Sequence, residues 1–314
     1  MYIFLVILMY AIWSSVFSLG KMALQYSPPL FLTGFRMALA GLLLLIYFAI
    51  SKRVNFTKID KKQIISFLLL SFFSIYLTNA CEFWGLQHLS AAKTCFIYSL
   101  SPFFAALFSY LHFKEKMSLK KWGGLSIGLI GMVPVLMNQT GSEEIMNAFS
   151  FLSWPALAVM LAALSSVYGW VLLRLVVKDN TLSPLLANGV SMLIGGLFAF
   201  IHSFFFENWS PIPVEPEHFG AFLKGTLLMI LISNLICYNL YGMMLKRYTA
   251  TFLSFMGLLS PIFASISSWI ILGEPLSWAM ILSTAIVSLG LWMVYKAELQ
   301  QGYIVDKKKI TPIS

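Results

Sequence analysis

Three ionisable side chains stand within or at the edge of long apolar stretches of this sequence, namely Arg36, Glu82 and Lys93. Because an ion is costly to bury in a membrane, such residues are functional candidates by default. At about 1.5 Å per residue, Arg36 lies about 10 Å into its predicted helix, with Glu82 and Lys93 near a helix end and a helix start. Together they would form a charged vestibule in which Glu82 attracts a cationic group and Arg36 or Lys93 meets a carboxylate. The alternative is mutual neutralisation that fixes helix packing.

Amide and aromatic side chains also interrupt the apolar stretches. Because a buried amide or hydroxyl in lipid needs a partner, each contacts either another helix or a bound solute. Trp13, Tyr98 and Tyr168 lie well inside their predicted helices, which disfavours a place in the interfacial aromatic belt. Core filling is the simple explanation for any single ring, and a solute-binding site is the functional one. The candidates are Trp13, Tyr76, Asn79, Tyr98, Tyr168, Trp170, Asn188, Asn234 and Asn239.

The composition places these residues in a membrane. Of the 314 residues 59% are hydrophobic and 11% charged, with a mean hydropathy of +0.84, whereas about a quarter of the residues of a soluble domain are charged. The net charge of +9 comes from short basic runs between apolar segments, which is typical of membrane proteins and argues against nucleic-acid binding. The three cysteines lie in apolar segments without the spacing of a disulfide framework or a metal site.

Ten stretches are long enough to cross a hydrocarbon core, which takes about 17 to 25 residues as a helix. Since only helices satisfy an open-ended backbone in lipid, the expected fold class is an all-α integral membrane protein with ten transmembrane helices. The predicted spans lie near residues 2–24, 30–50, 63–86, 91–113, 121–138, 153–175, 183–206, 219–243, 248–272 and 276–296.

The chain repeats one of its segments. Residues 88–135 and 247–294 align without a gap at an offset of 159, matching Ser101-Pro102 with Ser260-Pro261 and Glu115 with Glu274. An earlier segment beginning at Pro29 recurs from Pro184 at an offset of 155, which places Trp13 and Tyr168 at equivalent positions. Each half is therefore a five-helix unit, and an odd number of helices predicts that the two repeats are inverted relative to the membrane.

The basic residues predict the orientation. All but four of the 21 Lys and Arg residues fall in alternate connections and the C-terminal tail, while the other connections carry Glu143, Glu144, Glu207, Glu215 and Glu217. The positive-inside rule then places both termini in the cytoplasm. The two copies of the duplicated loop agree with this orientation, because four lysines surround Glu115 on the inner side and none surrounds Glu274 on the outer side.

Two prolines and two glutamates recur in the duplicated segment. Pro102 and Pro261 fall near the middle of their predicted helices, where a proline removes a backbone hydrogen bond. We interpret them either as gates of alternating access or as packing kinks. Glu115 and Glu274 precede the next helices, where a carboxylate is stabilised by the helix dipole, so structural capping is favoured.

No sequence signature of an enzyme accompanies these features. The four histidines are scattered, and no phosphate-binding glycine loop, nucleophile elbow or zinc-protease motif occurs. We expect no catalytic residues, no metal and no cofactor.

The ordered motifs resemble the EamA repeat of the drug/metabolite transporter superfamily. They are Trp13-Ser14-Ser15, Pro28-Pro29 followed by Arg36, Ala91-Ala92 followed by Ser101-Pro102, and the Glu115 and Glu274 segments. The resemblance implies repeats at 1–139 and 151–297, a cytoplasmic tail at 298–314, and a central cavity with helices 5 and 10 at the periphery. One departure is Ser191, which stands opposite Arg36, so any role of that charge is one-sided.

The resemblance implies a secondary transporter of a small polar organic metabolite in the bacterial cytoplasmic membrane, working by alternating access. An amino acid or related metabolite is preferred, then a nucleoside-bearing zwitterion such as S-adenosylmethionine, as used by members in host-dependent bacteria, then efflux of lipophilic drugs. The alternative is a membrane sensor or assembly subunit that uses the fold as a scaffold. The expected partners are the solute and the lipid bilayer, with a homodimer as a further candidate.

Overall fold

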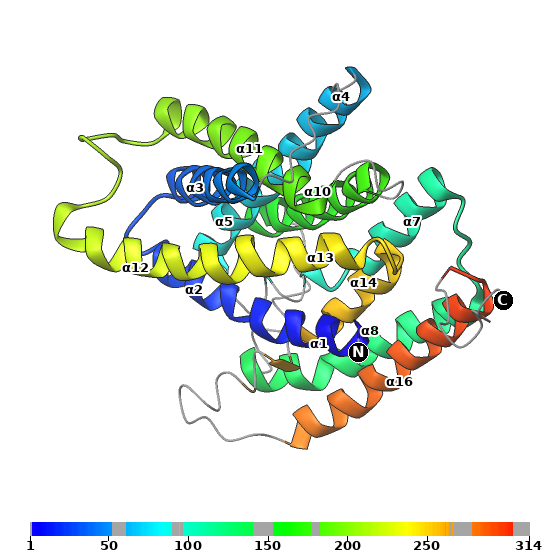
Figure 1. The fold of residues 1–314 in the computed structure, drawn as a ribbon. Coiled ribbons are helices and arrows are strands. Elements are labelled where there is room, and N and C mark those ends of the chain that lie inside the picture. The colour runs from blue at the N-terminus through cyan, green and yellow to red at the C-terminus, as the bar shows by residue number, and fades with distance from the viewer. Residues whose placement is uncertain are drawn as a thin grey trace.

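The computed structural model describes residues 2–51, 61–89, 94, 97–140, 153–177, 183–260, 262, 263, 266 and 278–303. This part of the chain folds into helices and their connections, with no strand among the described residues (Figure 1). The expected all-α membrane class is confirmed. Seven described helical spans are long and apolar enough to cross a membrane. The count of ten stays a prediction.

The helices of the first half follow the predicted order. They are α1 (Tyr2–Trp13), α2 (Ser15–Ala23), α3 (Pro29–Ile50), α4 (Lys61–Leu70), the π-helix η1 (Ser71–Leu77), α5 (Thr78–His88), α7 (Ser101–Phe113) and α8 (Leu119–Thr140).

The second half repeats the order. Its helices are α10 (Trp154–Val177), α11 (Pro184–Phe206), η2 (Pro216–His218), α12 (Phe219–Met229), the π-helix η3 (Ile230–Cys237), α13 (Tyr238–Met244), α14 (Ala250–Met256), η4 (Gly257–Leu259) and α16 (Trp278–Gln300).

Equivalent helices of the two halves pack against each other. Helix α3 lies along α11, and α8 lies along α16 at one edge of the bundle (Figure 1). Glycines allow the close approach, since a Cβ at Gly41 would lie 2.4 Å from the backbone nitrogen of Leu193, and one at Gly124 would lie 2.8 Å from the carbonyl oxygen of Gly290. The glycine-bearing faces of α3 and α8 are thus packing faces.

Pro102 does not kink the middle of a continuous helix. Helix α7 begins at Ser101, so Pro102 occupies its first turn, where the missing N–H leaves no helical bond unmade. The chain breaks just before it, where Leu100 N donates to Ile97 O at 3.1 Å. In the second half the chain forms the 3₁₀-helix η4, which ends two residues before position 261. Pro261 and Glu274 lie outside the described residues.

Two buried ion pairs join the halves near the end of the bundle that we predict to be cytoplasmic. The Glu115 carboxylate lies 2.8 Å from Arg174 of α10. The hydroxyl of Ser118, not Glu115, accepts the backbone N–H of Lys121 at the start of α8. Lys121 Nζ lies 2.9 Å from Glu298, with both side chains at most 1% exposed. Glu298 also accepts the hydroxyl of Thr249, which caps α14. One carboxylate therefore connects α8, α14 and α16.

We expect Glu298→Ala to lower the free energy of unfolding by about 3 to 5 kcal/mol, because it leaves the Lys121 ammonium buried without a counter-ion. Unfolding in detergent, followed by circular dichroism, measures the change. Glu217→Ala, at an exposed position, should have little effect. A double Lys121→Met/Glu298→Met variant should be more stable than Glu298→Ala, and the opposite order would contradict this explanation.

Candidate substrate-binding cavity

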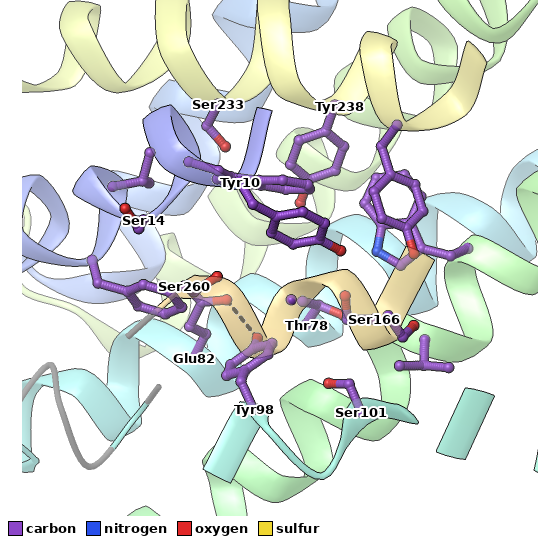
Figure 2. A pocket seen from close by; sticks show the side chains of 18 of the residues that line it. Tyr10, Ser14, Thr78, Glu82, Tyr98, Ser101, Ser166, Ser233, Tyr238 and Ser260 are labelled. Carbon is purple, nitrogen blue, oxygen red and sulfur yellow. Dashed lines mark hydrogen bonds between the residues drawn. The ribbon is translucent and has the colours of Figure 1, made fainter. Parts of the chain in front are cut away.

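A cavity of about 130 Å³ lies between the two halves (Figure 2). Its wall is formed by side chains of α1, α2, α3, α5, residues 98–101, α10, η3, α13, α14 and η4, so both repeats contribute. Six of the predicted site residues line the cavity. Trp170 comes from α10 of the second repeat, and the others come from the first repeat, namely Trp13, Arg36, Asn79, Glu82 and Tyr98.

Arg36 is the cation of the cavity wall. It is 2% exposed, and one of its terminal nitrogens, Nη2, donates to Asn79 Oδ1. The Asn79 amide nitrogen in turn donates to Ile75 O at 2.7 Å, which orients the amide oxygen toward the guanidinium. The guanidinium carbon lies 4.8 Å from the centre of the Phe83 ring. The Nε–H of Arg36 is buried and has no hydrogen-bond partner among the described residues.

Glu82 is the carboxylate of the cavity wall. Its Oε2 accepts the hydroxyl of Tyr98 at 2.5 Å, and Figure 2 shows the two side chains meeting inside the cavity. In the described part of the chain no Lys or Arg nitrogen lies within ion-pair distance of this carboxylate. Arg36 and Glu82 therefore line one cavity without a direct ion pair, and their opposite charges act on each other through space. Lys93 lies outside the described residues.

A cluster of aromatic rings forms another wall. The Trp170 ring packs on Tyr241 at a centroid distance of 4.2 Å and on Tyr238 at 5.0 Å. Trp13 packs against all three of these rings, with Tyr238 the nearest at 5.5 Å, and it also packs on Tyr10 at 6.1 Å. Trp170, Tyr238 and Tyr241 are buried, whereas Trp13 is only partly buried. Trp13 is thus the ring of this cluster best placed to stack on a flat solute.

The remaining predicted residues lie outside the cavity wall. Tyr76 hydrogen-bonds His202 at 2.9 Å, and Tyr168 packs between Phe73 and Phe108. Asn188 donates to Asn239 and to the carbonyl of Tyr238, both at 3.0 Å.

Asn234 is fully buried with its amide nitrogen 2.9 Å from Met37 Sδ. Asn239 also donates to the carbonyls of Asn234 and Leu235, at 3.1 and 3.0 Å. The structure places these amides in helix packing.

The comparisons with known proteins identify the architecture. The model of the EamA-like transporter family matches residues 1–137 and 153–296. The chain belongs to this family. It is a transporter with many membrane-spanning helices, not an enzyme, and the predicted resemblance is confirmed.

Similar proteins cover nearly the whole transporter. A protein of Chlamydia muridarum (strain MoPn / Nigg) named S-adenosylmethionine/S-adenosylhomocysteine transporter is 40% identical over 311 residues, 98% of this chain and 96% of its own length. A protein of the same name from Chlamydia trachomatis serovar L2 is 40% identical over 309 residues, 98% of this chain and 93% of its own. A solved crystal structure that is 16% identical, with 94% of this chain and 97% of that one aligned, superposes with a TM-score of 0.73 and shares the fold.

Sequence reasoning missed part of the transporter's cavity wall. Many of the missed residues carry hydroxyl groups, and they include Tyr10, Ser14, Thr78, Ser166, Ser233, Tyr238, Tyr241, Ser254 and Ser260. The repeat offset held a signal for two of them. At an offset of 159, Tyr238 is equivalent to Asn79 and Tyr241 to Glu82, so the first-repeat candidates point to these tyrosines.

Two adjacent serines of α10 test the boundary of the cavity. Ser166 lines it, whereas Ser165 is 1% exposed and donates to Phe73 O at 2.8 Å. In a variant with its native cysteines replaced by alanine, Ser166→Cys should react with a small water-soluble maleimide and Ser165→Cys should not. Mass spectrometry of the labelled protein measures the reaction, and equal labelling would contradict the assigned wall.

Proposed function

We propose that the transporter moves S-adenosylmethionine and S-adenosylhomocysteine across a bacterial cytoplasmic membrane. The observation that carries the proposal is the 40% identity to proteins of that name over 98% of the chain. Identity that extends over both repeats includes the helices that line the cavity, not only the framework of the fold.

The chemistry of the cavity supports this substrate. The adenine ring is flat and suits the partly buried face of Trp13, because aromatic rings stack. The amino-acid end carries a carboxylate for the free Nε–H of Arg36 and an ammonium for Glu82. A purely lipophilic drug would offer no charged group to either Arg36 or Glu82, which disfavours drug efflux.

The two repeats support alternating access as the mechanism. We assign residues 1–139 and 151–297 to the repeats and 298–314 to a cytoplasmic tail, with both termini in the cytoplasm. The segments that contain Pro102 and Pro261 then act as the gates, because each directly follows a break or tightening of its helix. A homodimer stays a prediction.

Uptake of labelled S-adenosylmethionine into proteoliposomes tests the proposal, and unlabelled S-adenosylhomocysteine should compete with it. A membrane sensor would bind these compounds without moving them. Saturable uptake is therefore the expected result, and binding without flux would contradict the assignment as a carrier.

Arg36→Gln should lower the apparent affinity for S-adenosylmethionine by roughly 10-fold to 100-fold, since it removes a charged donor from the carboxylate site. Lys224→Gln is the matched control, because Lys224 is exposed on α12 and does not line the cavity. Uptake kinetics measure both variants. Equal apparent affinities would refute the role of Arg36.

The inverted topology has its own test. Lys116 is exposed next to Glu115, and the equivalent loop of the second repeat contains Glu274. In intact cells that express cysteine-replaced variants, an impermeant thiol reagent should label Glu274→Cys and leave Lys116→Cys unlabelled. Permeabilised cells give the labelling control for Lys116→Cys, and labelling of both from outside would overturn the topology.

A further inference from the structure

The only described partner of the cavity carboxylate belongs to a different helical segment. Glu82 lies on α5, and the Tyr98 hydroxyl that it accepts lies in the segment before α7. A hydroxyl is a weaker partner for a carboxylate than a cation is, because charge-assisted pairs between two ions are stronger. A cationic group that enters the cavity therefore competes with Tyr98 for Glu82.

Tyr98 lies at the point where the fourth transmembrane segment is broken. It is followed by the turn at Ser99 and Leu100, and α7 begins at Ser101. Since the chain does not continue as a regular helix from Tyr98 into α7, the contact of Tyr98 with α5 is not part of the α7 helix. Its ring also touches Phe17 of α2, with 5.8 Å between centroids.

The second repeat has no equivalent of this contact. The position equivalent to Tyr98 at the offset of 159 is Gly257, which has no side chain. There the broken helix is held by the Tyr10 hydroxyl, which donates to Leu253 O at 2.7 Å. A backbone carbonyl inside a helix is not a binding site for a cationic solute in the way a carboxylate is. Only the contact of the first repeat is open to competition by the ligand.

We propose that Tyr98 is a positioning residue that couples occupancy of the cavity to movement of residues 97–113. In the empty carrier its hydroxyl satisfies Glu82 and holds this segment against α5. The ammonium or sulfonium group of the solute takes the carboxylate, and the segment is released. This coupling rests on the proposed function, because it requires a cationic solute.

Such coupling makes the loaded carrier reorient faster than the empty one. Net exit of labelled solute from a vesicle requires the empty carrier to return, and the Tyr98–Glu82 hydrogen bond restrains that return. Solute outside the vesicle lets the carrier return loaded, so labelled solute then exits faster. The ratio of exchange to net efflux measures this restraint, and general damage to the fold lowers both rates without a specific change in the ratio.

The experiment uses proteoliposomes loaded with labelled S-adenosylmethionine, with and without unlabelled compound outside. Tyr98→Phe should lower the ratio of exchange to net efflux by roughly tenfold, since it deletes a hydrogen bond to a charged group. Tyr168→Phe is the matched control, because it removes one hydroxyl from a ring that packs against Phe108 of α7 outside the cavity. Its ratio should equal that of the unmodified chain.

Glu82→Gln separates the two roles of the carboxylate. The glutamine oxygen still accepts the Tyr98 hydroxyl, but its neutral amide does not attract a cation. Net efflux should stay low, and the apparent affinity for the solute should fall roughly tenfold.

An unchanged ratio in Tyr98→Phe, or unchanged affinity in Glu82→Gln, overturns the proposal. If the unmodified chain transports no S-adenosylmethionine, the proposed function fails instead, so the two failures are distinguishable.

Discussion

A polar group inside a membrane has no water to bind, and this constraint explains most of the structure. Hydroxyl groups within the helices return to the backbone, as Ser71 does to Phe67 O and Ser191 to Ala187 O, both at 2.7 Å. The π-helices obey the same constraint. Thr78 donates to Phe73 O at 2.7 Å and Asn239 to Asn234 O at 3.1 Å, five residues earlier in each case. Side chains thus bind carbonyl oxygens exposed by the wider turns.

Where the constraint is not met within the protein, a ligand is the natural partner. The buried ions near the predicted cytoplasmic end lie next to their counter-ions, as Lys121 does to Glu298 and Arg174 to Glu115. In the cavity the cation and the carboxylate are instead held by neutral groups, Asn79 and Tyr98. Neutral partners fix the position of an ion without a direct ion pair, and Arg36 and Glu82 act on each other only through space. This difference separates ions that hold the fold from ions available to a zwitterionic solute.

The sequence predicts the class of the fold and the charged end of the cavity, because both follow from the cost of burying a charge. Charged residues such as Arg36 and Glu82 stand out in the sequence of an apolar helix. Polarity alone does not show which partner satisfies a residue, and for this reason Asn188 and Asn239, which bind each other, look the same in sequence as Asn79. The helix break before Pro102 was also out of reach, since a proline is compatible with a kink or with a first turn.

The duplication explains why the cavity has two unlike walls. Helices η1 and η3 begin 159 positions apart, the same offset as the segments that follow them, so the third and eighth transmembrane segments are equivalent. On them the first repeat places Asn79 and Glu82 against the cavity, and the second repeat places Tyr238 and Tyr241 at the same two positions. Likewise Arg36 has Ser191 as its equivalent, which donates to the backbone of its own helix. Inverted copies that were identical would present two similar surfaces to the solute. Divergence at these few positions, with the glycine contacts between the copies kept, is sufficient to give one polar wall and one aromatic wall, which fits a solute with a charged end and a flat ring at the other.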